Sequence, residues 1–153
     1  MCLSRVTTVH EKPKLMQFYK VMRRVRRKGK PNLYHFQYRS SIRPLIKDKL
    51  RHASRGWIFG FNGSYKAGFH GYTNLKAAAR EISSYPEFNK FIGLPGRYVV
   101  VLCEGLVRTE GIEYSSKIRV VVADTLTILK EIPAAKIRKV KGLKPLKKKT
   151  VKK

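Results

Sequence analysis

The stretch from Gly68 to Ile82 places the strongest constraint on the fold, because a glycine-flanked Phe-His pair leads into a short amphipathic helix. Thr73 or Asn74 can cap that helix by accepting a backbone N–H bond in its first turn. We expect the helix to cover about residues 73–84 and to pack closely through its alanines, with the glycines allowing a sharp turn before it. Its apolar face follows the i, i+3, i+4, i+7 spacing: Leu75, Ala78, Ala79 and Ile82.

Runs of β-branched and aromatic residues on both sides of this helix predict strands. The clearest run covers residues 97–104, and further runs cover 17–22, 33–38, 57–61, 106–108, 112–122 and 124–132. Pro13 predicts a loop before the 17–22 run, and Gly105 and Gly111 predict turns after the 97–104 run. The predicted fold class is α+β: one domain with an antiparallel β-sheet or meander and one main short helix packed on it.

The charge of the chain is distributed unevenly. Residues 1–55 contain 16 Lys/Arg and 2 acids, residues 56–133 contain 9 and 7, and residues 134–153 contain 10 and none, within a formal net charge of +26. A nearly neutral middle with basic ends is typical of a protein whose body folds alone while its extremities meet phosphate. We therefore expect a compact domain at 1–133 and a Lys-rich extended tail at 134–153.

The densest cationic run lies at the predicted hairpin tip, residues 23–32, where six of the eight residues from Arg23 to Lys30 are Lys or Arg. Arginine offers forked donors that match phosphate, and Tyr34, His35 and Tyr38 could stack on bases. A solvated loop kept basic for solubility is the alternative. The residues predicted to contact phosphate are Arg23, Arg24, Arg26, Arg27, Lys28, Lys30, Lys136, Arg138, Lys139, Lys141, Lys144, Lys147, Lys148 and Lys149.

This charge pattern favours a non-enzymatic protein that binds RNA or DNA through the phosphate backbone, with affinity that falls steeply with salt. Such a protein fits a ribonucleoprotein of the ribosomal type or a virion-associated structural component. An alternative is a minor capsid protein that uses its basic tails for assembly. With two cysteines, and no apolar run of signal-peptide or membrane-span length, we expect an intracellular or virion location rather than secretion.

A second alternative is a small enzyme that acts on a nucleic-acid or nucleotide substrate. His70 could serve as a general base in its glycine-framed turn, and Cys2 could become an N-terminal nucleophile if Met1 were removed. No Walker loop, Rossmann fingerprint, zinc spacing or nucleophile elbow is present in the sequence, so we expect no metal or cofactor. The alternating Trp57, Phe59 and Phe61 fit either a core strand or a base-stacking platform.

The sequence contains the short motifs Met1-Cys2-Leu3, Tyr19-Lys20-Val21, Gly68-Phe69-His70, Gly96-Arg97-Tyr98-Val99-Val100 and Tyr114…Ile118…Leu126-Thr127-Ile128-Leu129. Together these motifs resemble a diffuse group of small proteins from bacteria, phages and large DNA viruses. The resemblance covers roughly residues 1–132, and it implies a compact α+β fold and a viral origin, but no reaction. The heavy Arg/Lys loading of 23–30 and 134–153 departs from that group and favours a nucleic-acid or virion-interior role.

Overall fold

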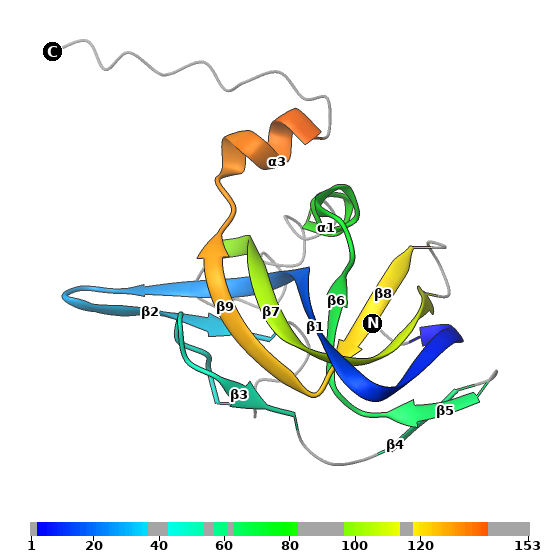
Figure 1. Ribbon diagram of the computed structural model, residues 1–153. Coiled ribbons are helices and arrows are strands. Elements are labelled where there is room, and N and C mark those ends of the chain that lie inside the picture. The colour runs from blue at the N-terminus through cyan, green and yellow to red at the C-terminus, as the bar shows by residue number, and fades with distance from the viewer. Residues whose placement is uncertain are drawn as a thin grey trace, which may run out of the picture.

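The computed structural model describes residues 3–36, 43–53, 57–60, 63–82, 97–113 and 118–140. In these ranges the chain is mostly antiparallel β-structure with two short helices (Figure 1). In chain order the elements are β1 (Leu3–Arg27), β2 (Lys30–His35), β3 (Arg51–His52), β4 (Trp57–Gly60), β5 (Gly63–Lys66), β6 (Phe69–Tyr72), α1 (Leu75–Ile82), β7 (Arg97–Glu113), β8 (Arg119–Ala123), β9 (Thr125–Glu131) and α3 (Ala134–Val140).

Two long bent strands, β1 and β7, form the centre of the main sheet (Figure 1). They pair antiparallel over almost their whole length, from Leu3 opposite Glu113 to Arg24 opposite Arg97. On its other edge β1 pairs with β6, which pairs with β8, which returns to β7. These pairings make a closed circuit, so most strand edges are satisfied internally. β9 and β3 extend the sheet beyond β7, and β4 and β5 form a separate hairpin.

The expected loop at Pro13 and the expected turns at Gly105 and Gly111 are wrong, because all three residues lie inside long strands. The β1–β7 register shifts between Val9 and Lys14, and Pro13 lies in that irregular stretch. Proline has no N–H for a ladder, so an unpaired stretch of strand is where it is tolerated. Such irregularities bend a strand and increase its twist, which fits the strong curvature of β1.

Both faces of the sheet are buried along the first half of β7. Tyr98 and Val100 belong to the core beneath the helices, whereas Val99, Val101 and Cys103 belong to the core on the opposite face. Because successive side chains of a strand point to opposite faces, the continuous apolar run at 98–103 satisfies both cores at once. The two cores hold the long strands in a fixed position, and this position determines where β1 leaves the body of the protein.

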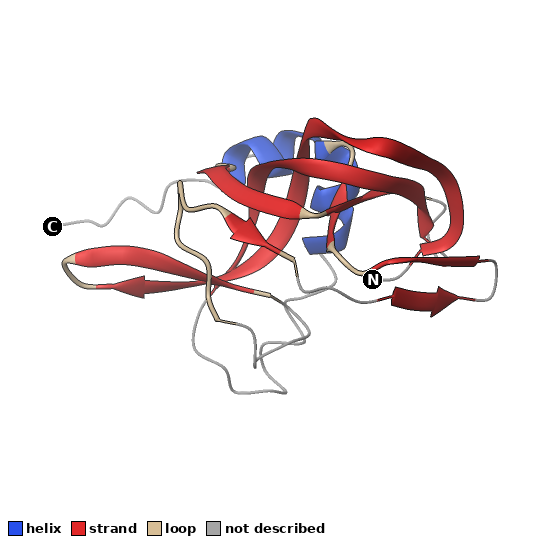
Figure 2. Cartoon of the chain, turned by 60° about the horizontal axis from the view of Figure 1, so that its bottom comes forward, coloured by secondary structure: helices blue, strands red, loops and turns tan. Residues whose placement is uncertain are grey.

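The predicted helix is present as α1, and Asn74 caps it by accepting the Ala77 N–H at 2.9 Å. The expectation of an extended segment from residue 134 is wrong for 134–140, which form the second helix, α3. Ile137 of α3 is buried in the same core as Ala78 of α1, and both helices lie on one side of the sheet (Figure 2). The apolar residues Ile137 and Val140, three apart, supply the docking face of α3.

Gly68 and Gly71 serve close packing rather than a sharp turn, because β6 passes through Gly71 as a regular strand. A Cβ atom at Gly71 would overlap the Phe18 ring, and one at Gly68 would lie 2.7 Å from the Ala123 carbonyl oxygen. Among the glycines in the described ranges, only Gly29 has a positive φ, of 65°. That residue forms the β1–β2 turn, where the left-handed conformation favours glycine.

Candidate nucleic-acid interface

The predicted basic hairpin exists as a two-stranded ribbon that projects from the body (Figures 1 and 2). β1 loses its β7 partner after Arg24, whereas its pairing with β2 continues to Arg27 opposite Lys30. On the outer edge of β2, Tyr34 and Leu45 exchange two backbone hydrogen bonds of 2.9 and 2.8 Å. Beyond these anchors, residues 25–33 continue as β1 and β2 alone. We call residues 25–33 the ribbon.

The exposed cations of the ribbon lie on both strands and at the turn. Arg26, Lys28 and Lys30 are exposed, and none of them makes an ion pair with a carboxylate in the described ranges. Arg27 donates from Nε and Nη2 to the Pro31 carbonyl oxygen at 3.0 and 2.8 Å, which clamps the turn. The ribbon therefore presents several positive charges on a backbone whose conformation is held locally.

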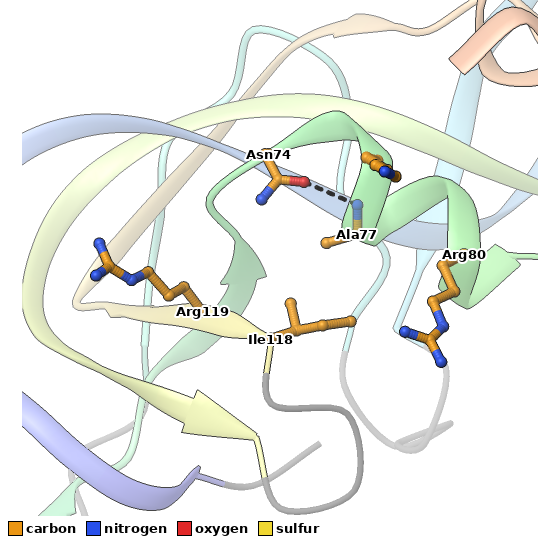
Figure 3. Close-up of a pocket in the computed structure, with 6 residues that line it drawn as sticks. Asn74, Ala77, Arg80, Ile118 and Arg119 are labelled. Carbon is orange, nitrogen blue, oxygen red and sulfur yellow. Dashed lines mark hydrogen bonds between the residues drawn. The ribbon is translucent and has the colours of Figure 1, made fainter. Parts of the chain in front are cut away.

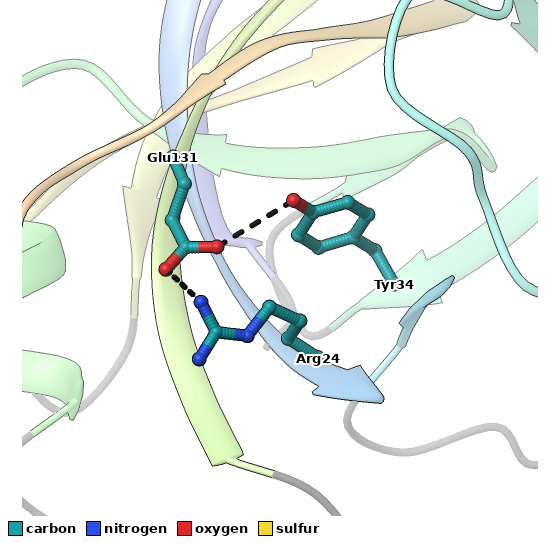
Figure 4. Close-up of polar contacts among 3 residues, drawn as sticks. All are labelled: Arg24, Tyr34 and Glu131. Carbon is teal, nitrogen blue, oxygen red and sulfur yellow. Dashed lines mark hydrogen bonds and ion pairs between the residues drawn. The ribbon is translucent and has the colours of Figure 1, made fainter. Parts of the chain in front are cut away.

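The structure gives Arg24 a different role from the predicted phosphate contact. Its side chain is only 10% exposed, and its Nη1 donates to Glu131 Oε1 at 2.5 Å. Tyr34 donates from its hydroxyl to the other oxygen of Glu131 at 3.5 Å (Figure 4). These contacts join β1, β2 and β9 at the base of the ribbon. Arg24 positions the ribbon and is not available to an external anion.

His35 lies at the base of the ribbon, where its surroundings disfavour its charged form. Arg23 lies directly opposite His35 in the β1–β2 register. Burial, followed by the neighbouring Arg23 charge, lowers the pKa of His35 below its usual value. Arg23 is half-buried, and Tyr34 is only 4% exposed, so the expectation that Tyr34 stacks on bases does not fit its position.

The predicted cations of the C-terminal region divide into two groups. Lys136 and Lys139 are exposed on α3, and Arg138 is half-buried there. The predicted residues beyond the helix lie outside the described part of the chain: Lys141, Lys144, Lys147, Lys148 and Lys149. Within the described residues, α3 thus adds a second set of positive charges on the helical side of the sheet.

A shallow hollow of about 330 Å³ lies between α1 and the start of β8 (Figure 3). Because Asn74 Oδ1 is used by the helix cap, its amide nitrogen remains as a donor at the hollow. Sequence reasoning missed this hollow, since its two sides are about 40 residues apart in the chain and meet only through folding. The lining residues include three cations and no carboxylate: Asn74, Lys76, Ala77, Arg80, Ile118 and Arg119.

Lys20 is the other chemically distinctive residue that sequence reasoning missed. Its Nζ donates to the His70 carbonyl oxygen at 2.5 Å and lies 5.3 Å from the centroid of the Phe36 ring. Burial lowers the pKa of Lys20 to about 8, and burial raises the pKa of the nearby Cys103 thiol to about 12. The alternation of Lys20 with Phe18 and Met22, both fully buried, was the available signal that this lysine faces a core.

Of the two residues considered for an enzyme, the structure describes only His70. His70 lies in β6, where its backbone carbonyl accepts the Lys20 bond, and Cys2 lies outside the described residues. The side chains of Trp57 and Phe59, and all of Phe61, also lie outside what the structure describes. In the described part of the chain, no three His, Cys, Asp or Glu side chains gather as metal ligands would.

Neither helix in the described ranges has the length and apolar character that a membrane crossing requires. Comparisons with protein-family models, curated proteins and solved structures found no match to this chain.

Proposed function

We propose that the protein binds the phosphate backbone of RNA or DNA, chiefly through the ribbon and with help from α3. The observation that carries this proposal is the projection of Arg26, Lys28 and Lys30 beyond the body without a carboxylate partner in the described residues. Concentrated, unpaired positive charge costs self-repulsion in the free protein, and a polyanion relieves it. A polyanionic partner also accounts for the formal net charge of +26.

The expected mode of binding is release of condensed counterions. Each Lys or Arg that neutralises a phosphate contributes about 0.9 to the negative slope of log K against log salt on B-form DNA. Loss of three such contacts therefore makes the slope less negative by about 2.7, and at 0.1 M salt, relative to 1 M salt, it weakens binding roughly 500-fold. A ribonucleoprotein particle or a virion interior would supply this polyanion.

The test compares two triple variants that remove the same charge. Arg26→Ala/Lys28→Ala/Lys30→Ala changes the ribbon, while Lys12→Ala/Lys14→Ala/Lys66→Ala removes three exposed cations elsewhere. Fluorescence anisotropy with labelled RNA and DNA, at several salt concentrations, gives the slope and affinity of each protein. The ribbon variant should lose most of the affinity and the control little. Equal losses in both variants would refute a ribbon-centred interface.

A further inference from the structure

We infer that the ribbon enters the major groove of B-form duplex DNA, and that the protein therefore prefers duplex DNA to duplex RNA and to single strands. This inference rests on the proposed phosphate-binding function and names the substrate within it. It follows from the shape of the ribbon, from its rigidity and from the lack of aromatic side chains among residues 25–33.

The ribbon has the dimensions that this groove accepts. From Arg24, where β7 pairing ends, four or five residues lead to the turn at Gly29. At about 3.3 Å per residue the ribbon reaches roughly 13–16 Å beyond the body. The major groove of B-form DNA is about 8.5 Å deep and about 12 Å wide, and it admits a two-stranded β-ribbon. The major groove of A-form RNA is deep and too narrow for side chains to read.

The ribbon is held in one conformation at both ends. The Arg24–Glu131 ion pair and the Tyr34–Leu45 backbone bonds fix its base, and the two Arg27 bonds to Pro31 fix its turn. A flexible cationic loop would follow any phosphate chain, including a single strand. A pre-organised ribbon loses little conformational entropy on binding, provided that the partner offers a groove of matching shape.

The charges of the ribbon suit the two walls of a groove. Arg26 is on β1 and Lys30 is on β2, while Lys28 lies at the turn. When a ribbon lies in a groove, its two strands face opposite phosphate backbones, so cations on both strands can make contacts at the same time. These contacts position the protein without selecting a base sequence.

Recognition of a single strand usually relies on exposed aromatic rings that stack on bases. Tyr34, at the base of the ribbon, is 4% exposed and donates from its hydroxyl to Glu131, and His35 beside it is half-buried. Within the described ribbon, residues 25–33, there is no aromatic side chain. The ribbon therefore offers charge and shape to a duplex, but no stacking platform to an unpaired strand.

The experiment measures the affinity of the full chain, at one fixed salt concentration, for four probes of the same 20-base-pair sequence. They are duplex DNA, duplex RNA, single-stranded DNA, and duplex DNA whose pyrimidines carry bulky 5-substituents that fill the major groove. We expect duplex DNA to bind at least tenfold more tightly than each of the other three. The Arg26→Ala/Lys28→Ala/Lys30→Ala variant should lose that preference, and the Lys12→Ala/Lys14→Ala/Lys66→Ala control should keep it.

The outcomes separate this inference from the function on which it rests. Equal affinity for duplex DNA and duplex RNA, with a large loss in the ribbon variant, would overturn the groove inference and leave phosphate binding in place. Unchanged affinity for the groove-filled duplex would overturn it in the same way. If the ribbon variant binds every probe as the control does, both proposals fail.

Discussion

Arg24 and Glu131 form an ion pair at the base of the ribbon, and removing one partner should lower the free energy of unfolding by a different amount from removing the other. The Arg24 side chain is 10% exposed and the Glu131 side chain is 28% exposed. Glu131→Ala would leave a guanidinium group almost enclosed, with Nη1 unpaired in addition to Nε, which already has no partner among the described residues. Arg24→Met would instead leave a carboxylate that water can reach, beside an apolar side chain of similar length.

The sizes of the two effects follow from these exposures. Removing one partner of a buried ion pair costs about 3–5 kcal/mol, whereas exposed pairs contribute about 0–1 kcal/mol. Because Glu131 is partly exposed, we expect Glu131→Ala to lower the free energy of unfolding by about 3 kcal/mol and Arg24→Met to lower it by about 1 kcal/mol. Glu131→Gln, which keeps an acceptor but loses the charge, should fall between them.

Urea denaturation followed by circular dichroism measures these differences, with Lys47→Ala as the control. Lys47 and Asp48 form a pair whose side chains are 52% and 67% exposed, so this control should change stability by less than about 1 kcal/mol. In the double variant Arg24→Met/Glu131→Ala, the enclosed charge is gone, and the protein should be more stable than with Glu131→Ala alone. Equal losses in the two single variants, or a double variant less stable than both, would refute this reasoning.

Three further predictions concern the core, a buried amine and the second helix. Gly105→Ala should lower the free energy of unfolding by at least about 2 kcal/mol in urea denaturation, because its Cβ would overlap the Thr125 carbonyl oxygen. Gly29→Asn, at an open left-handed position, should lower it much less. A larger loss for Gly29→Asn than for Gly105→Ala would contradict the packing argument. The lowered pKa of Lys20, about 8, means that the unfolded chain binds more protons above pH 8, so stability should rise by about 1 kcal/mol from pH 8 to 9 relative to Lys20→Met. Above pH 9 the raised pKa of Cys103 opposes that rise in stability. If the stability of the Lys20→Met variant depends on pH in the same way as that of the unmodified protein, the pKa of Lys20 is not lowered. Ile137→Ala should weaken the docking of α3 by about 2 kcal/mol and speed trypsin cleavage at Lys136 and Arg138, whereas an unchanged cleavage rate would mean that α3 is not held through Ile137.

The elements that local pattern specifies were predictable from the sequence. The alanine-rich helix begins and ends close to its predicted bounds because its cap and its apolar spacing are both local. The basic hairpin was predictable because Gly29 supplies the positive φ of its turn. The helix α3 was not predictable in this way. Lysines dominate the composition of its segment, and its helical state depends on burial of Ile137 in a core formed by residues that are distant in sequence.

The main wrong predictions for the sheet concern turns at glycines. Gly105 and Gly111 predict turns, yet both lie inside β7, where the Thr125 and Arg5 carbonyl oxygens approach too closely for a side chain. The need for glycine at these positions comes from strands that are distant in sequence, so no local sequence pattern predicts it. The role of Arg24 was hidden for the same reason, because its carboxylate partner, Glu131, lies 107 residues further along the chain.

The long β1–β7 pairing also bears on how the chain is made. The ladder joins Leu3 to Glu113, and the base of the ribbon is completed only by Glu131. A ribosome delivers β1 before β7, so the residues of β1 that pair with β7 must wait until β7 has been synthesised. Pairings of such large sequence separation slow folding, because the loop between them must close before any contact is gained. During that interval β1 lacks its β7 partner, whereas the ribbon needs only β1 and β2, so Arg26 and Arg27 are presented beside the RNA of the ribosome that produces them.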